Sequence, residues 1–176
     1  MRRLAAIAVA AVALAACAEE PLGLAPPNTP AMYAPEPAAD FRASDFAWST
    51  QAGSASIVGI LAFGGGPGRY ICNDVILTPE TPWTRRRMMV LYGSPMAADV
   101  PLDIVQARTA SAPSDDYARF AKKAVCDGEN RFSFDALPPG VWYVITLAKP
   151  IGGRGGRVAV MRRVETRVGQ RQVTLN

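Results

Sequence analysis

Short apolar runs, separated by glycine, proline and polar residues, make up most of the chain from Ser54 onward. The run from Ile57 to Phe63 is almost continuously apolar, which predicts a strand in the core of a sandwich. Arg157–Val164 alternates more weakly, which predicts an outer strand. The segments rich in β-branched and aromatic residues are Ala55–Phe63, Tyr70–Leu77, Phe132–Phe134, Val141–Ala148, Val158–Val168 and Gln172–Leu175. Their spacing predicts an all-β sandwich.

Two short segments have helical patterns. In Ser114–Ala121 the serine can cap the helix, acidic residues occupy the first turn, and Tyr117 shares a face with later apolar residues. A second short helix is predicted around Trp83–Leu91, and Ser94–Ser111 is predicted to be irregular. Lys122–Cys126 is expected to enter a further strand.

The first seventeen residues have the pattern of a bacterial lipoprotein signal. Arg2 and Arg3 form a positive start, and Leu4–Leu14 is an apolar run well short of the roughly 20 residues of a membrane-spanning helix. The ending Leu14-Ala15-Ala16-Cys17 resembles the lipobox of bacterial lipoproteins. The resemblance implies that Cys17 becomes the mature N-terminus and that its thiol carries a diacylglyceryl group. An ordinary secretory signal cut after Ala16 is the alternative.

Lipidation of Cys17 implies an exported protein anchored to a membrane, because two or three acyl chains hold a protein stably at a bilayer. Ala18 follows the cysteine, whereas aspartate there is the usual inner-membrane retention signal of enteric-type bacteria. We therefore expect the periplasmic face of the outer membrane. Six prolines predict a disordered tether over residues 17–48. A signal peptide at 1–16 and this tether leave residues 49–176 for one domain.

The amino-acid composition argues against several classes of function. The chain has no histidine, so it lacks the commonest general base and metal ligand. Without the two arginines of the signal, 17 basic residues stand against 15 acidic ones, and no nucleic-acid partner is expected. Three cysteines are present. With Cys17 lipidated, Cys72 and Cys126 are expected to form a disulfide in an oxidising compartment; two free thiols are the alternative.

One segment resembles a known family. Asp127–Val144 reads Asp-Gly-Glu-Asn-Arg-Phe-Ser-Phe-Asp-Ala-Leu-Pro-Pro-Gly-Val-Trp-Tyr-Val, which resembles the signature of carboxypeptidase regulatory-like domains. Ser56–Gly59 and Val75–Pro82 are similar to the first strand of that family and the segment that follows it. The resemblance implies a transthyretin-like Greek-key β-sandwich over residues 54–176, with 84–115 unmatched.

The Asp127–Val144 segment predicts two features of the fold. Asn130 stands where the family usually has glycine, and asparagine also tolerates a left-handed backbone conformation. Phe132 and Phe134 point to the same face of a strand, and a Pro-Pro-Gly turn returns the chain over them. We expect these two residues, with Leu137 and Tyr143, to close the sandwich.

The sequence contains no recognisable catalytic set. Paired carboxylates at a workable spacing and a nucleophile beside a base are both lacking. Gly64–Gly68 lacks the Lys-Ser/Thr of a phosphate-binding loop and predicts a hairpin loop. Asp127, Glu129 and Asn130 provide fewer oxygen ligands than Ca²⁺ needs, so a turn is expected there. We therefore expect no metal, no cofactor and no enzymatic activity.

The predicted binding surface combines aromatic and basic residues in the stretch that the family pattern leaves unmatched. Its members are Trp83, Arg85, Arg86, Arg87 and Tyr92. Basic residues with an interfacial tryptophan suit an anionic lipid or a cell-wall polymer. An ordinary solvated charged face is the alternative.

These features predict a lipid-anchored, non-catalytic envelope β-sandwich that acts as an interaction or structural module. Its partners would be the membrane, through the lipid, and an envelope protein or a cell-wall polymer. One alternative is a subunit of an envelope machine, such as the outer-membrane lipoprotein of type VI secretion, which docks through a loop or a free sheet edge. Another is a carbohydrate- or peptidoglycan-binding module with Trp83, Tyr92 or Trp48 as its exposed aromatic residue.

Overall fold

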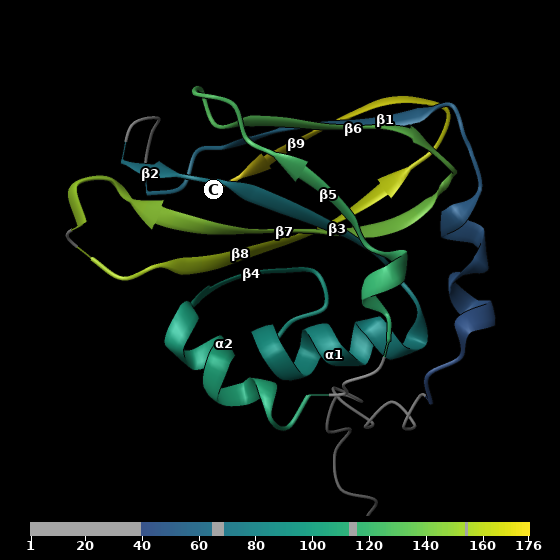
Figure 1. Ribbon diagram of the computed structural model, residues 1–176, viewed down its shortest axis with the longest axis horizontal. Coiled ribbons are helices and arrows are strands. Elements are labelled where there is room, and N and C mark those ends of the chain that lie inside the picture. Colours follow the sequence, from purple (N-terminus) through teal and green to yellow (C-terminus); the bar gives the residue numbers. More distant parts are fainter. Residues whose placement is uncertain (1–39, 65–68, 113–115, 154) are drawn as a thin grey trace, which may run out of the picture. The chain divides into compact units, whose positions relative to one another are not determined.

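The structure is a computed structural model that describes residues 40–64, 69–112, 116–153 and 155–176. Within these residues, nine strands form two sheets (Figure 1). In the first sheet, β1 (Ala55–Leu61) lies between an antiparallel β6 (Arg131–Leu137) and a parallel β9 (Gly169–Leu175). The second sheet is antiparallel, in the order β4-β8-β7-β3-β5. Its strands are β3 (Asp74–Pro79), β4 (Ala97–Pro101), β5 (Lys122–Val125), β7 (Gly140–Pro150) and β8 (Val158–Thr166), and a short β2 (Tyr70–Ile71) also pairs with β7. The predicted all-β sandwich is confirmed.

The main hydrophobic core lies between the two sheets, because alternate side chains of facing strands point inward. Phe132 and Phe134 of β6 are only 4% and 5% exposed, and Leu137 is fully buried, as predicted. Trp142 rather than its neighbour Tyr143 joins this core, so the prediction for Tyr143 is wrong. The largest side chains of the core belong to Ile57, Leu61, Val75, Leu77, Phe132, Phe134, Leu137, Trp142, Val144, Val160 and Leu175.

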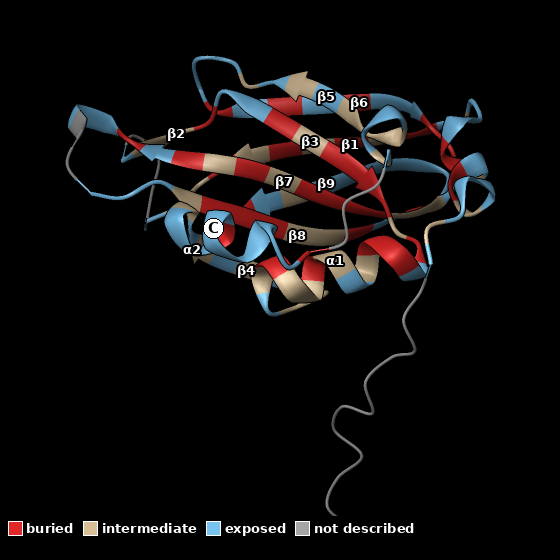
Figure 2. Cartoon of the chain, turned by 60° about the horizontal axis from the view of Figure 1, so that its bottom comes forward, coloured by how far each residue is buried: buried red, intermediate tan, exposed pale blue. Residues whose placement is uncertain are grey.

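Two helices cover the outer face of the second sheet, α1 (Pro82–Tyr92) and α2 (Leu102–Thr109) (Figure 2). Tyr143 packs there against Met88 of α1 and is fully buried on the side of β7 opposite Trp142. A strand with both faces buried has no polar side to reveal which residues face the core. The residues buried between these helices and the sheet are Met88, Leu91, Val105, Ala112, Tyr143, Ala159 and Met161.

Helix α1 confirms the short helix predicted around Trp83–Leu91, and local signals set both of its ends. The Thr81 hydroxyl accepts a hydrogen bond from the Thr84 backbone N–H (3.1 Å), and the Thr84 hydroxyl accepts one from the Thr81 N–H (2.7 Å). This reciprocal pair satisfies two donors that would otherwise lack partners. Pro82 fits the first helical position, and Gly93, with φ of 74°, ends the helix.

Residues 94–111 are not irregular, contrary to the prediction, because they form β4 and α2. Helix α2 buries only Val105 among its residues, so its sequence has little helical periodicity. Strand β4 pairs with β8, which places β8 inside the sheet, and the outer-strand prediction for Arg157–Val164 is therefore also wrong.

The helix predicted at Ser114–Ala121 is also wrong in the part that is described. Residues 113–115 lie outside the described ranges, and residues 118–120 form only a 3₁₀ turn, η2 (Ala118–Phe120). The strand expected at Lys122–Cys126 is confirmed as β5. The loop predicted at Gly64–Gly68 falls mostly on residues 65–68, which are outside the described ranges.

The packed structure begins before residue 49, where the predicted tether ends. Residues 43–50 form a 3₁₀ helix, η1 (Ala43–Thr50), whose Phe46 is fully buried and stacks on Phe120 with ring centroids 4.7 Å apart. The predicted signal peptide, Cys17 and the tether up to residue 39 lie outside the described residues. Among the described helices, none has the length and apolar character needed to cross a membrane.

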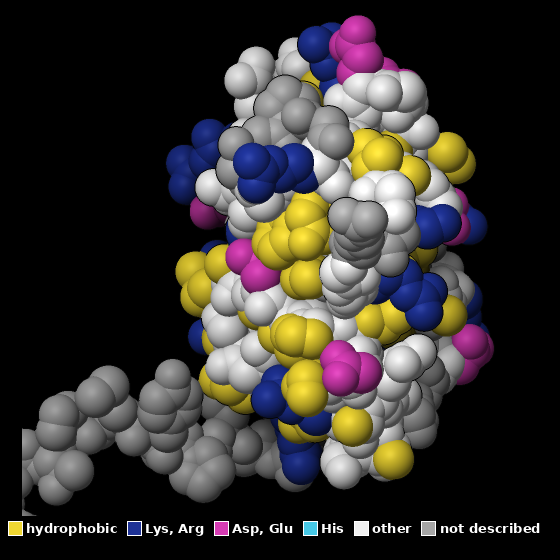
Figure 3. Space-filling model, turned by 90° about the vertical axis from the view of Figure 1, so that its left-hand side faces the viewer, with side chains coloured by type: hydrophobic (Ala, Val, Ile, Leu, Met, Phe, Trp, Pro, Cys, Tyr) yellow, Lys and Arg dark blue, Asp and Glu magenta, His cyan; other side chains and the backbone are white. Residues whose placement is uncertain are grey.

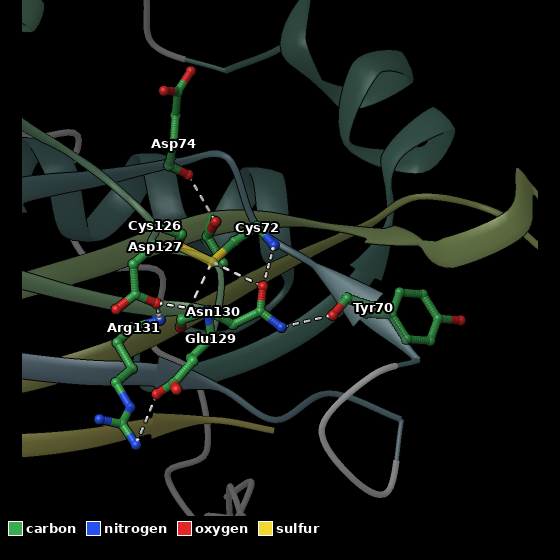
Figure 4. Close-up of a disulfide and its surroundings, with 9 residues drawn as sticks. Tyr70, Cys72, Asp74, Cys126, Asp127, Glu129, Asn130 and Arg131 are labelled. Atoms are coloured by element: carbon green, nitrogen blue, oxygen red, sulfur yellow. Dashed lines mark hydrogen bonds and ion pairs between the residues drawn. A yellow bond between two sulfur atoms is a disulfide. The ribbon is translucent and has the colours of Figure 1, made fainter.

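The predicted disulfide is present and joins Cys72, between β2 and β3, to Cys126, after β5, with Cα atoms 5.8 Å apart (Figure 4). Asn130 lies beside it in the left-handed conformation, with φ of 62°. Its side-chain oxygen accepts a hydrogen bond from the Cys72 N–H (3.1 Å), and its amide donates to the Tyr70 carbonyl (2.8 Å). Asparagine therefore supplies two hydrogen bonds to the disulfide corner that glycine has no side chain to make.

The expected turn at Asp127–Asn130 is also present (Figure 4). The Asp127 carboxylate accepts hydrogen bonds from the backbone N–H groups of Glu129 (2.9 Å) and Arg131 (2.8 Å). Asp127 thus stabilises its own loop, as short polar side chains commonly do in turns.

Candidate functional site

Trp83, the tryptophan of the predicted binding surface, is buried and only 2% exposed. Its ring packs edge-on against Phe41 and Phe46, with centroids 5.5 and 6.4 Å away, and lies 5.0 Å from the ring of Tyr117. Two of these neighbours come from the segment that was assigned to the tether, so the sequence pattern did not reveal them. Trp83 has a packing role, and the expectation that it presents an exposed ring is wrong.

The three neighbouring arginines of α1 have separate surroundings. Arg85 donates from Nη1 to a carboxylate oxygen of Glu80 at 3.0 Å. The Arg87 guanidinium lies over the Tyr117 ring, 5.0 Å from its centroid, and Arg86 is exposed. The predicted Arg85–Arg87 surface is thus divided among three environments.

Tyr92 is the last residue of α1 and is half-buried. Burial raises the pKa of Tyr92 to about 12; Tyr117 adds to the rise and Arg87 opposes it. Tyr92 also lines a separate, mainly apolar groove of about 300 Å³ together with Ile76 and Ile145. Trp83 is buried and Tyr92 half-buried, and among the five predicted residues only Arg86 is exposed, so they do not form one exposed surface.

A different site is formed where η1, the first turn of α1 and the beginning of β7 meet at one end of the sandwich (Figure 1). It is a shallow groove of about 400 Å³, which we call the Trp48 groove. The groove is lined by Trp48, Glu80, Thr81, Pro82, Arg85, Gly140, Val141 and Arg163. Of these, sequence reasoning had singled out Trp48 and Arg85, but in separate roles.

The Trp48 ring is held in place by the core beneath it. It packs edge-on against Trp142, with ring centroids 4.8 Å apart. It also lies on the backbone of Gly140, where an added Cβ would be 2.2 Å from a ring carbon of Trp48. Trp142 is itself anchored, since its indole N–H donates to the Thr166 hydroxyl at 3.1 Å. Trp48 is therefore half-buried on a rigid base, with part of its surface left to line the groove.

Glu80 is the charged centre of the groove. One carboxylate oxygen accepts from Arg85 of α1, and the other accepts from Nε of Arg163 of β8. The Glu80 side chain is 13% exposed, and such burial strengthens a hydrogen-bonded ion pair relative to one in water. Its backbone N–H donates to the Val141 carbonyl at 2.8 Å, which extends the pairing of β3 with β7 up to the start of α1. The three charges thus come from three segments: the connection between β3 and α1, α1 itself, and β8.

The chemistry of the groove suits recognition. It combines the apolar surface of one aromatic ring with guanidinium donors and a carboxylate, all held by the fold. Small-molecule sites have this composition: an apolar wall with a few fixed polar groups that set orientation. Among the described residues, no cluster of three or more Cys, Asp or Glu side chains is placed to hold a metal ion.

The opposite end of the sandwich, which carries β2 and the hairpin between β7 and β8, has a different surface. Hydrophobic side chains gather there in several groups, separated by Lys, Arg and acidic side chains (Figure 3). Ile151, in the turn of the hairpin, is about half exposed.

Comparison with known proteins supports the fold. No protein-family model matches the sequence, and no curated protein matches it significantly. The structure resembles the crystal structure of a candidate carbohydrate-binding protein from Pseudomonas aeruginosa, with a TM-score of 0.54. The two chains are 21% identical, and the similarity covers 78% of this chain and 98% of the other. At this identity the likeness concerns the fold.

Proposed function

We propose that this protein is a non-catalytic carbohydrate-binding module that holds a sugar ring against Trp48. The observation that carries the proposal is the fixed position of the Trp48 ring beside the Glu80–Arg85–Arg163 cluster. A sugar has one face of C–H groups and a rim of hydroxyls. The electron-rich face of an indole attracts such C–H groups, and charged planar side chains form directed hydrogen bonds with hydroxyls.

Rigidity of the groove supports this proposal. Sugars are strongly hydrated, so a binding site must replace hydrogen bonds to water with well-placed bonds of its own. Glu80, Arg85 and Arg163 are already oriented by their mutual ion pairs, and Trp48 by Trp142 and Gly140. The groove therefore requires little ordering when a ligand arrives, which favours affinity.

The neighbour from Pseudomonas aeruginosa, described as a candidate carbohydrate-binding protein, favours the same class of ligand. The exposed aromatic residue of the module would be Trp48. Trp83 is buried, and Tyr92 lies in the other groove. We also propose that the chain is a distant relative of carboxypeptidase regulatory-like domains, on the strength of the Asp127–Val144 signature at the disulfide corner.

We further propose that a lipid on Cys17 presents the module at the periplasmic face of the outer membrane. The support is the pattern of Arg2-Arg3, the apolar run and Leu-Ala-Ala-Cys. Mass spectrometry of the mature protein should find a diacylglyceryl modification at Cys17, and Cys17→Ser should abolish it. An unmodified N-terminus at Cys17 would remove the anchor from this account.

Glycan-array binding followed by affinity electrophoresis tests the carbohydrate proposal. The wild-type chain should bind a subset of glycans, Trp48→Ala should lose that binding, and Trp48→Phe should retain part of it because a ring remains. Tyr70→Ala, at the opposite end of the sandwich, is the control and should bind normally. Thermal melts of all variants separate loss of binding from loss of folding. Binding that survives Trp48→Ala in a folded variant, or no glycan binding by the wild type, would overturn the proposal.

A further inference from the structure

Arg163 is held in the Trp48 groove by only part of its side chain. Its Nε donates to Glu80, and its backbone N–H donates to the Met96 carbonyl at 2.8 Å. Within the described part of the chain, no hydrogen bond is made by its Nη1 or Nη2 atom. The side chain is 26% exposed and lines the groove. A guanidinium fixed at Nε thus keeps donors available for a ligand.

The pair of Nη atoms has a specific chemical preference. Guanidinium N–H groups form a rigid planar fork that matches the two oxygens of a carboxylate. Because Glu80 already fixes the plane of the Arg163 guanidinium, less side-chain freedom is lost when an anion binds. A hydroxyl would use only part of this fork.

Glu80 is less available to a ligand than its charge suggests. Each of its two oxygens already accepts a hydrogen bond from an arginine, and the side chain is mostly buried. The groove therefore offers a ligand mainly hydrogen-bond donors. A ligand that supplies acceptors, and above all a carboxylate, is its best complement.

We propose that the Trp48 groove selects acidic glycans, in which a sugar carboxylate pairs with the Nη atoms of Arg163 while the ring of the sugar lies against Trp48. This inference rests on the proposed carbohydrate-binding function and adds the class of sugar and the residue that specifies it. Trp48 provides affinity for sugar rings in general. Arg163 discriminates between charged and neutral forms of the same sugar.

Polysaccharides with and without free carboxylates provide the matched ligands for the test. Polygalacturonate, alginate and hyaluronate would each be compared with their methyl esters, which keep the rings and remove the charge. Binding of the full chain would be measured by calorimetry for the wild type, Arg163→Gln and Arg163→Lys. Arg157→Gln is the control, because Arg157 is an exposed arginine outside the groove. Melting temperatures check that each variant folds.

We expect at least one acid polymer to bind about tenfold or more tightly than its ester, which is the scale of a charge-assisted pair. Arg163→Gln should remove that difference, Arg163→Lys should retain part of it, and Arg157→Gln should leave it unchanged. Equal binding of acid and ester in the wild type would overturn the acidic preference and leave Trp48-dependent sugar binding intact. A preference that persists in folded Arg163→Gln would overturn the role of Arg163. If no polymer of either form binds, the acidic-glycan inference fails, and the glycan array alone decides the proposed function.

Discussion

The Trp48 ring lies so close to the backbone of Gly140 that a methyl group on residue 140 would come within 2.2 Å of it. Glycine at this position therefore does more than permit a turn after Pro138 and Pro139. It allows an aromatic side chain from η1 to rest on the beginning of β7, beside Trp142. The wall of the proposed binding groove depends on that close approach.

Gly140→Ala should displace the Trp48 ring and destabilise the fold by about 1–3 kcal/mol, the usual cost of overpacking a well-filled site. Urea unfolding measures the cost, and affinity electrophoresis should show weaker glycan binding. Gly128→Ala is the matched control, because a Cβ at residue 128 meets no atom within 4 Å. Equal stability and equal binding of the two variants would show that the contact with Gly140 does not hold Trp48.

Asn130 should be more than a substitute for glycine. Asn130→Gly keeps the left-handed conformation but leaves the Cys72 N–H and the Tyr70 carbonyl without this partner, at a cost of about 1–3 kcal/mol. Asn130→Ala loses the same bonds and adds about 1–2 kcal/mol of backbone strain. Chemical denaturation should rank the wild type above Asn130→Gly, and Asn130→Ala lowest. A glycine variant as stable as the wild type would show that the two hydrogen bonds contribute nothing.

The disulfide should provide a large part of the stability of this domain. Cys72 and Cys126 are 54 residues apart in sequence, and closing a loop of that length stabilises a fold by about 4 kcal/mol in the chain-entropy model. Adding a reductant during urea unfolding should lower the midpoint, and the double variant Cys72→Ala/Cys126→Ala should show the lowered midpoint without reductant. An unchanged midpoint after verified reduction would contradict this expectation.

Much of the sandwich can be predicted from sequence because short apolar runs bounded by glycine, proline and polar residues mark its strands, and β6 alternates between exposed and buried side chains from Arg131 to Asp135. The same reasoning fails at Trp142 and Tyr143. Strand β7 is covered by the first sheet on one face and by α1 on the other. Large apolar side chains therefore occur on both faces of the strand, and the sequence does not show which of the two aromatic residues points toward the core between the sheets. A one-residue ambiguity of this kind exchanges the two faces of a strand.

The site was harder to predict than the fold. Glu80, Gly140 and Arg163 come from the connection between β3 and α1, from β7 and from β8, and no local motif links them. Trp83 and Arg85–Arg87 look like an interaction surface because they are adjacent in the chain. Helical geometry sends neighbouring side chains in different directions, and Phe41 and Phe46 cover Trp83 from a segment whose composition suggests a tether.

Tyr92 should make stability fall at high pH. Its pKa is about 12 in the folded protein and about 10 when unfolded, so between these values the unfolded chain has released a proton that the folded chain retains. The unfolded state then binds fewer protons, and the free energy of unfolding declines as pH rises from about 10 toward 12. Urea unfolding at pH 9, 10 and 11 should show a smaller decline for Tyr92→Phe. Identical declines in the two proteins would contradict the raised pKa.

The most direct test of the central claim follows the indole N–H signals of the three tryptophans by NMR during titration with a glycan that the protein binds. Trp83 is buried and serves as the internal control, and Trp48→Phe assigns the Trp48 signal. If the sugar binds in the Trp48 groove, the Trp48 signal should shift with ligand concentration, the signal of Trp142 beneath it should shift less, and that of Trp83 least. A saturable titration that shifts signals elsewhere and leaves Trp48 unchanged would contradict the proposed site.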